Sequence, residues 1–320
     1  MQRQMVESSS NLSTIPPRPA VHPYIGIAIG VLAVSAASII IKLAQDAKAP
    51  SLIIAAYRLT FASIVLAPVA LTRHRAELAG LTRRDLVIAG ISGLFLGLHF
   101  GTWITSLEFT TVASSVVFVS TSPLFVGLFS LVVWREKLGA PLIIGLMVAM
   151  VGGAMVGLSD ACAVTRGGIV CPSLAELVRG RAVIGDLLAL AGAVSVAGYL
   201  LIGRRLRARL SLIPYISLSY GAAAVTLVAA ALVSGEPFFG YSPAAYFWMG
   251  LLALVPQLIG HSAFNWALRY LSATYVSVTI LGEPIGSTLL AVFIFHETPP
   301  SLKLLGGLFI LGGILLASKR

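Results

Sequence analysis

Charged residues are scarce in this chain, and their scarcity excludes an ordinary soluble protein. Asp, Glu, Lys and Arg make up 11% of the 320 residues, whereas a soluble domain carries about 25%. Hydrophobic residues make up 58%, and the mean hydropathy is +0.95. The chain has too little charge to cover a globular surface, so we expect it to lie in a membrane.

Recognised catalytic patterns are also missing. The sequence contains no HExxH, no GxSxG and no Walker-type GxxxxGK[ST] pattern, and no apolar segment holds a pair of Cys or Asp residues. We therefore expect neither an enzyme nor an ATP-hydrolysing pump, and we expect no cofactor and no bound metal. The net charge of +10 lies mostly in short loops between apolar segments, so we expect no nucleic-acid partner.

The sequence does contain a series of apolar segments. Each has roughly 17–24 residues, enough for a helix to cross about 30 Å of hydrocarbon. They lack the alternation of a barrel strand, so we expect an all-α polytopic membrane protein with ten transmembrane helices. The predicted spans cover residues 24–43, 51–71, 86–106, 111–133, 141–158, 183–203, 212–233, 244–267, 272–295 and 302–318.

The positive residues indicate how these spans are oriented. With the N-terminus placed inside, 15 of the 22 Lys and Arg residues fall in inner segments and six in outer segments. Cytoplasmic loops carry an excess of positive charge, so this bias places both termini in the cytoplasm. We expect the chain to lie in the cytoplasmic (inner) membrane of a prokaryote.

The chain contains the same unit twice. Residues 106–153 align with residues 267–314 at a constant offset of 161 positions, and Pro123 meets Pro284 in this alignment. Each copy has five spans, an odd number, so the second copy must enter the membrane from the opposite side. The sequence therefore predicts two inverted five-helix repeats, the pattern of a carrier that opens to alternate sides.

We divide the chain into four parts. These are a disordered cytoplasmic tail, a first repeat, an extracytoplasmic linker loop and a second repeat, at residues 1–22, 23–158, 159–182 and 183–320. The linker carries both cysteines, Cys162 and Cys171. A disulfide can form there because the loop is placed on the oxidising side, and two unpaired thiols are the alternative.

Two segments resemble the EamA domain of the drug/metabolite transporter superfamily. They run from Ser106 to Leu158 and from Ala267 to Ser318. Each starts a helix with small residues, carries a proline within it and a glutamate at its end, and closes with a glycine-bearing helix. Arg58, early in the second span, also fits the pattern of that family.

The resemblance implies a ten-helix carrier with two pseudo-symmetric halves. It also implies a central cavity lined mainly by spans three, four, eight and nine, with spans five and ten at the periphery. Family members mostly move small metabolites, often outward, so we expect an exporter of amino acids or related compounds. A non-transporting membrane scaffold or sensor is the alternative, and a monomer suffices because both halves are in one chain.

Glu283 is the side chain that most favours transport. It lies near the middle of the ninth span, where a carboxylate costs roughly 3 kcal/mol on insertion scales. We expect it to bind a proton or a substrate amine, with a helix-to-helix hydrogen bond as the alternative. Its counterpart in the first repeat is Ser122. Arg58 is expected to attract an anionic group or to pair with Glu283, and snorkelling to the outer surface is the alternative.

Other polar and aromatic side chains are candidates for the lining of a substrate path. The two intramembrane histidines, in spans three and eight, titrate near neutral pH in water, and structural roles are the alternative. The remaining candidates are polar or aromatic residues within the predicted spans. The set comprises His99, His261, Trp103, Gln257, Asn265, Tyr57 and Tyr199.

Small residues and prolines predict where helices pack closely or bend. Three glycines, each four positions apart in span three, form a smooth stripe on which another backbone can pack. Prolines within spans remove a backbone hydrogen bond, and the glycines that flank Glu283-Pro284 favour a hinge there. The residues concerned are Gly93, Gly97, Gly101, Pro123, Pro256, Gly282, Pro284 and Gly286.

Overall fold

The computed structural model describes residues 21–110, 115, 118–133, 135–161, 163–165, 168–170, 181–295 and 299–319. The described part is helical apart from one short antiparallel hairpin, in which Ala163 pairs with Val170. That hairpin lies in the predicted linker loop, where no strand was expected. The predicted tail at residues 1–20 and both cysteines lie outside the described residues.

The helices follow the predicted apolar segments. The first half of the chain forms α1 (Pro23–Ser35), α2 (Ala37–Asp46), α3 (Ser51–Arg73), α4 (Arg75–Ala79), α5 (Arg83–Ser106), α7 (Ser122–Val132) and α8 (Ala140–Ala161), followed by β1 (Ala163–Thr165) and β2 (Gly168–Val170). The second half forms α10 (Arg181–Arg207), α11 (Leu212–Val233), α12 (Pro243–Leu252), the π-helix η1 (Ala253–His261), α13 (Ser262–Ala267), α14 (Ala273–Ile280), α15 (Glu283–Phe295) and α16 (Ser301–Ala317).

Within the residues that the structure describes, six helical stretches are long and apolar enough to cross a membrane. They are Pro23–Asp46, Ser51–Arg73, Arg83–Ser106, Ala182–Arg207, Leu212–Val233 and Pro243–Ala267. The other four predicted spans correspond to the apolar helices α7, α8 and α16 and to the pair α14 and α15. By length and composition the described residues therefore contain six candidate membrane spans, and ten spans remain a prediction.

The two copies of the repeat break their helices at equivalent positions. In the second copy α14 ends at Ile280 and α15 starts at Glu283, and in the first copy α7 starts at Ser122 after a turn. Pro123 and Pro284 thus lie in the first turn of a helix. The prediction that they remove a hydrogen bond in mid-helix was wrong, because an N–H at that position has no partner within the helix in any case.

Pro256 does disturb the interior of a helix. It lies within η1, the nine-residue π-helical stretch Ala253–His261. Proline lacks the N–H that an α-helix needs and clashes with the preceding turn, and a locally widened helix relieves both problems. The widened stretch carries two of the predicted site residues, Gln257 and His261.

The glycine stripe of α5 packs against α11. A Cβ on Gly97 would lie 2.9 Å from the Cβ of Thr226, and one on Gly101 would lie 3.3 Å from Leu227. A Cβ on Gly93 would overlap the backbone of Ser219. The stripe therefore allows the two backbones to approach closely, while a sliding motion along it stays a prediction.

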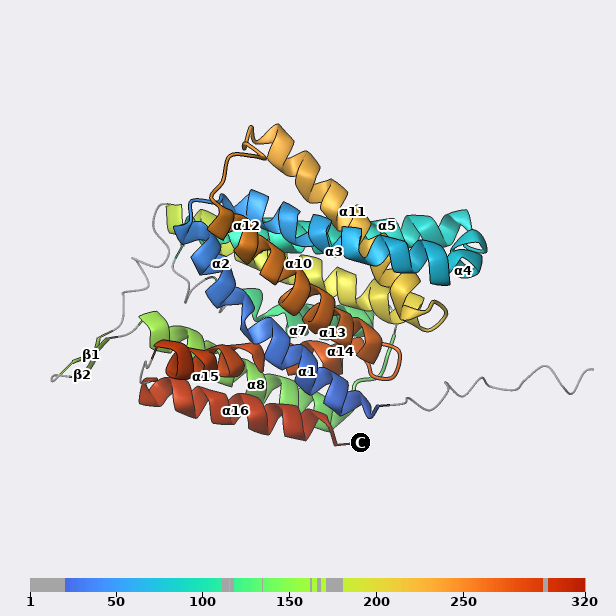
Figure 1. The fold of residues 1–320 in the computed structure, drawn as a ribbon. Helices are drawn as coiled ribbons and strands as arrows, with labels where there is room; N and C mark the ends of the chain where they lie inside the picture. The colour runs from blue at the N-terminus through green and yellow to red at the C-terminus, as the bar shows by residue number, and fades with distance from the viewer. Residues whose placement is uncertain are drawn as a thin grey trace, which may run out of the picture.

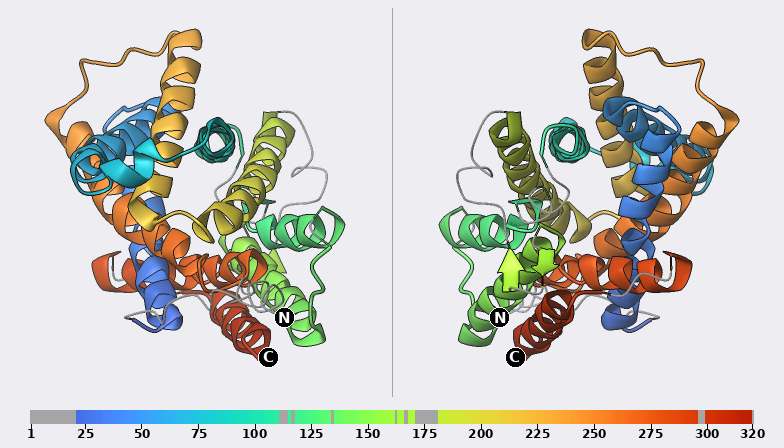
Figure 2. Two further views of the ribbon diagram at one scale, coloured as in Figure 1. Left: turned by 90° about the vertical axis from the view of Figure 1, so that its right-hand side faces the viewer. Right: turned by 90° about the vertical axis from the view of Figure 1, so that its left-hand side faces the viewer.

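Figure 1 shows how the ends of the chain are placed. The start of α1 and the end of α16 lie at the same end of the helical bundle, whereas β1 and β2 lie at the opposite end. The two views in Figure 2 show α8 and α16 together on one flank, away from α3 and α5. The side-chain cluster described next lies among α3, α5, η1 and α15.

Candidate functional site

Arg58 is the centre of the candidate site. Its side chain is 1% exposed, so the alternative that it snorkels to the surface is wrong. Its Nε donates a hydrogen bond of 2.9 Å to Oε1 of Gln257, and its Cζ lies 4.1 Å from the ring centroid of Phe100. The contact with Phe100 is a cation–π interaction between α3 and α5, which compensates part of the cost of burying the charge.

Two histidines contact the ring of Phe100, and a tryptophan stacks on one of them. The His261 ring meets Phe100 edge-on at 5.2 Å, and the His99 ring stacks on Trp103 at 5.8 Å and 11°. Nδ1 of His99 lies 3.0 Å from the carbonyl oxygen of Gly192. Because a carbonyl can only accept, that nitrogen carries a proton. Trp103 is 8% exposed, so it packs inside the bundle rather than anchoring the chain at a membrane interface.

Glu283 is the acidic member of the site. It begins α15, is partly buried, and interacts electrostatically with Arg58. Among the ion pairs of the described residues, however, none joins Glu283 to Arg58 within 4.0 Å. The backbone carbonyl of Glu283 accepts a hydrogen bond of 3.2 Å from Ser35 of α1. This contact satisfies one carbonyl at the break in the ninth span.

Arg58 also interacts electrostatically with both histidines. Five of the residues predicted from the sequence thus come together in space, although they belong to four different helical elements. We call this group the polar cluster. Its members are Arg58, His99, Gln257, His261 and Glu283.

A second polar network adjoins the polar cluster. Asn265 of α13 donates to the hydroxyl of Tyr199 at 2.5 Å and to the carbonyl of His261 at 2.7 Å. The hydroxyls of Tyr220 and Ser262 lie 3.2 Å apart, and Ser262 reaches the carbonyl of Gln257 at 3.4 Å. The predicted residues Asn265 and Tyr199 therefore belong to this network rather than to the polar cluster itself.

Two predicted site residues lie elsewhere. The hydroxyl of Tyr57 donates to the carbonyl of Phe238 at 2.6 Å, and its ring packs edge-on against Tyr246. Ser122 is buried in the first turn of α7. Within the described residues neither makes a hydrogen bond or ring contact with the polar cluster, so both lie outside it.

Three participants were missed at the sequence level. Phe100, Tyr220 and Ser262 were not singled out, although Phe100 follows His99 directly and Ser262 follows His261. Tyr220 is one of two tyrosines in the mostly apolar α11, and a buried tyrosine usually needs a hydrogen-bond partner for its hydroxyl. That requirement is the signal that would have identified it.

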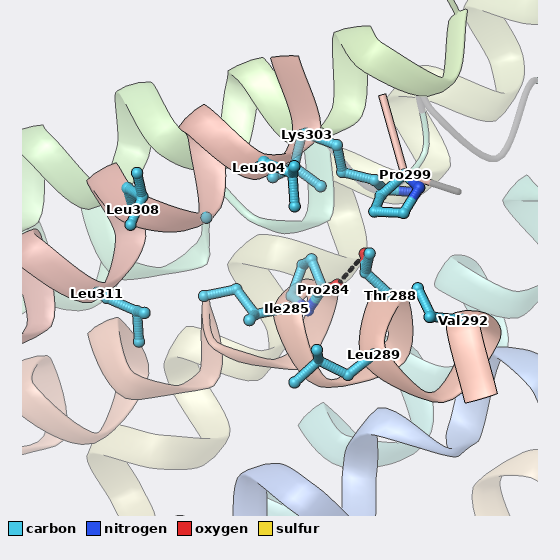
Figure 3. A pocket seen from close by; sticks show the side chains of 12 residues that line it. Pro284, Ile285, Thr288, Leu289, Val292, Pro299, Lys303, Leu304, Leu308 and Leu311 are labelled. Carbon is cyan, nitrogen blue, oxygen red and sulfur yellow. Dashed lines mark hydrogen bonds between the residues drawn. The ribbon is translucent and has the colours of Figure 1, made fainter. Parts of the chain in front are cut away.

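A hollow of ≈ 150 Å³ lies beside the break between α14 and α15. Figure 3 shows the side chains that line it. Its lining is almost wholly apolar, and Thr288 uses its hydroxyl to donate to the carbonyl of Pro284 at 2.8 Å. The hollow lies between α15 and α16, with Val156 of α8 also in its lining, and no member of the polar cluster lines it. It is lined by Val156, Pro284, Ile285, Thr288, Leu289, Val292, Pro299, Lys303, Leu304, Gly307, Leu308 and Leu311.

Comparison with known proteins places the chain in a family. The family model of EamA-like transporters matches residues 23–158 and 183–319. An uncharacterized transporter of Archaeoglobus fulgidus is 21% identical over 83% of this chain and 87% of its own length. The uncharacterized transporter YdfC of Bacillus subtilis is 23% identical over 69% of this chain and 67% of its own length.

Two further comparisons agree with this placement. A WAT1-related protein of Arabidopsis thaliana is 29% identical over 36% of this chain and 35% of its own length. A protein of known crystal structure shares the fold, with a TM-score of 0.72 and 20% identity over 92% of this chain and 96% of that one. The chain belongs to the EamA-like transporter family, and it is therefore a membrane transporter of small molecules rather than an enzyme.

Proposed function

We propose that this protein is a secondary transporter that exports amino acids or related compounds by alternating access. The observation that carries the proposal is the polar cluster. A fully buried arginine, a glutamine, two histidines and a glutamate gather inside an apolar bundle, beside a broken helix. Ionisable groups at such depth are costly, and in membrane proteins they mark binding sites and ion pathways.

In this proposal the two repeats move relative to one another around the polar cluster. Arg58 and His99 come from the first repeat, whereas Gln257, His261 and Glu283 come from the second. A motion of one repeat against the other therefore changes the distances within the cluster. It also exposes the cluster first to one side of the membrane and then to the other.

Glu283 is proposed to exchange a proton or to bind the amine of the substrate. It opens α15, so a change in its charge acts directly on the break between α14 and α15. Pro284 prevents a continuous hydrogen-bonded helix across this break. The charge state of Glu283 is thereby linked to the bend of the ninth span, which provides a route for coupling transport to a proton gradient.

The proposed setting is the inner membrane of a prokaryote, with ten spans, both termini in the cytoplasm and the loop at residues 159–182 outside. A tag in that loop and a tag at the N-terminus are expected to react from opposite sides of intact cells. Each chain holds both repeats, so a monomer is expected to transport.

The decisive experiment uses purified protein in liposomes. Labelled amino acids and nucleosides are tested for uptake and release, with and without a pH gradient. We expect saturable movement of amino acids, and we expect Glu283→Gln to abolish its dependence on the gradient. Asp186→Asn is the control, because Asp186 lies near the start of α10, outside the polar cluster, and accepts a hydrogen bond of 2.8 Å from the hydroxyl of Thr110.

Two outcomes count against the proposal. If no metabolite in a broad panel moves under any gradient, the scaffold or sensor function replaces transport. If transport occurs and Glu283→Gln leaves both flux and pH dependence intact, the role given to Glu283 is wrong while the transporter class stands.

A further inference from the structure

Within the described residues, only the Nε side of the Arg58 guanidinium makes a hydrogen bond. Its Nε donates to Gln257, and one face lies over the Phe100 ring. In the described part of the chain no acceptor lies within hydrogen-bonding distance of Nη1 or Nη2, although both atoms are buried. We call these two nitrogens the open edge of Arg58.

Gln257 adds a third unused donor. Because Arg58 Nε can only donate, the atom of Gln257 that faces it is Oε1, and the amide nitrogen Nε2 must point elsewhere. Nε2 is buried and makes no hydrogen bond of ordinary geometry within the described residues, although the Gln257 side chain interacts with the hydroxyl of Tyr220. Buried donors without acceptors are strongly unfavourable, so three of them side by side indicate a partner that is not part of the protein.

We propose that the open edge of Arg58, together with Nε2 of Gln257, binds the carboxylate of a zwitterionic substrate whose ammonium group faces Glu283. This inference rests on the transport function proposed above and names the part of the substrate that each residue recognises. A carboxylate offers two coplanar oxygens, which match the two parallel N–H groups of the guanidinium edge, and it has lone pairs left for a third donor.

The contact with Phe100 defines the direction from which the substrate is bound. The Cζ atom of Arg58 lies over the Phe100 ring, 4.1 Å from its centroid, so the ring blocks one side of the guanidinium. Its Nε side is closed by Gln257. A carboxylate is therefore bound end-on, in the plane of the guanidinium, rather than across the Nε side.

Charge balance selects a zwitterion over other anions. Arg58 and Glu283 attract each other but make no ion pair within 4.0 Å among the described residues. A guest with one carboxylate and one ammonium places an opposite charge at each of them and leaves the site neutral. A dicarboxylate or a phosphate ester would add uncompensated negative charge in a medium where charge is costly.

The test measures binding by the purified full-length protein, independently of transport. Each of the twenty common L-amino acids is compared with its α-carboxamide, which keeps the ammonium and side chain but lacks the carboxylate. Thermal stabilisation of the protein in detergent is the readout. We expect at least one amino acid to stabilise the protein and its amide to bind at least about tenfold more weakly, the usual loss for one charge-assisted contact.

Two variants of the site separate recognition from folding. Arg58→Lys keeps the positive charge but lacks the two parallel N–H groups of the guanidinium. Gln257→Glu keeps the oxygen that accepts from Nε of Arg58 and replaces the Nε2 donor with a negatively charged oxygen. Both are expected to lose the preference for the amino acid over its amide. Gln257→Glu is the safer of the two for folding, because it is isosteric and pairs with Arg58.

Arg207→Lys is the matched control. Arg207 is 2% exposed, like Arg58, but its Nε donates to the carbonyl of Asn265 at 3.0 Å and its Nη1 to the carbonyl of Leu210. This substitution is expected to lower the melting temperature without changing the preference for the carboxylate.

The inference is overturned if the amides bind as well as the amino acids, or if Arg58→Lys and Gln257→Glu retain the preference. It is also overturned, with the transport function intact, if the liposome screen identifies a substrate without a carboxylate. If no compound is transported at all, that result contradicts the proposed transport function, on which this inference rests.

Discussion

The backbone of Gly152 in α8 lies directly against the backbone of Gly306 in α16. A Cβ on Gly152 would lie 2.5 Å from the carbonyl oxygen of Gly306, and a Cβ on Gly306 would lie 2.7 Å from that of Gly152. Gly145 and Gly313 make the same kind of contact, at 2.5 Å in both directions. The repeat offset of 161 positions carries Gly145 onto Gly306 and Gly152 onto Gly313.

Gly145 contacts the repeat counterpart of Gly152, and Gly152 contacts the repeat counterpart of Gly145. The contacts between α8 and α16 therefore follow a two-fold pseudo-symmetry. In a symmetric contact, residue i of one unit meets j of the other, and j of the first meets i of the second. From Gly145 to Gly152 along α8, the contacted glycine in α16 changes from Gly313 to Gly306, so these two helices run antiparallel. The arrangement of α8 and α16 is therefore the one that an inverted duplication requires.

A methyl group at the crossing of α8 and α16 should destabilise the protein. Gly152→Ala is expected to lower the free energy of unfolding by about 1–3 kcal/mol, because a Cβ would push apart two packed backbones. Gly153→Ala is the control, since nothing lies within 4 Å of its added Cβ. Thermal unfolding in detergent measures both. Equal melting temperatures for the two variants would contradict the close crossing.

The contact between α1 and the start of α15 should control transport more than stability. Ser35 donates to the carbonyls of Val31 at 2.6 Å and Glu283 at 3.2 Å, and a Cβ on Gly286 would overlap its hydroxyl. Gly286→Ala is expected to reduce the transport rate about fivefold, and Ser35→Gly in the same chain should restore it, as coupling between residues in contact predicts.

The double variant distinguishes a local clash from a general defect. Gly312→Ala serves as control, because its added Cβ meets nothing within 4 Å. Initial rates in liposomes are measured for all variants at equal protein incorporation. If Ser35→Gly fails to rescue Gly286→Ala, then the contact with Ser35 is not what limits the movement of α15.

Much of this architecture can be predicted because the repeat is visible in the sequence. The offset that pairs Pro123 with Pro284 also pairs the starts of α7 and α15, so one observation predicts that the two helices correspond. The position of each proline within its helix did not follow. A proline within an apolar segment fits both a kink and a first turn, and only the neighbouring contacts decide between them.

The candidate site was predictable as a set of residues but not as a geometry. The cost of ionisable groups in hydrocarbon identifies Arg58, His99, His261 and Glu283 from their positions alone. The hydrogen bond from Arg58 to Gln257 joins residues 199 positions apart, and it depends on the π-helix around Pro256. Sequence spacing carries no information on such a contact, and for the same reason Phe100 was overlooked.

The tyrosine–asparagine network should contribute to stability through its hydrogen bonds. Asn265→Leu removes the hydrogen bonds from Asn265 to the hydroxyls of Tyr199 and Tyr220, at an expected cost of about 1–3 kcal/mol in the free energy of unfolding. Tyr199→Phe combined with Asn265→Leu should cost less than the sum of the two single substitutions, because both remove the same hydrogen bond. Additive losses in melting temperature would show that the pair at 2.5 Å contributes little.

The ion pair between Arg209 and Asp85 should contribute little to stability despite its short distance of 2.6 Å. Arg209 is 62% exposed, and exposed ion pairs are worth about 0–1 kcal/mol because water and salt screen them. Arg209→Gln is therefore expected to leave the melting temperature nearly unchanged. Asp85 has a second task, since it forms a capping box with Thr82 at the start of α5.

Asp85→Ala should consequently cost more than Arg209→Gln, by roughly the 0.5–2 kcal/mol that a helix cap is worth. Hydrogen exchange of the first turn of α5 gives an independent readout, because Asp85→Ala should speed exchange there while Arg209→Gln should not. The same ranking should survive in 1 M salt, which screens the ion pair but leaves the hydrogen bonds of the capping box in place. An equal effect of the two substitutions on melting temperature and exchange would show that the ion pair, rather than the cap, holds this end of α5.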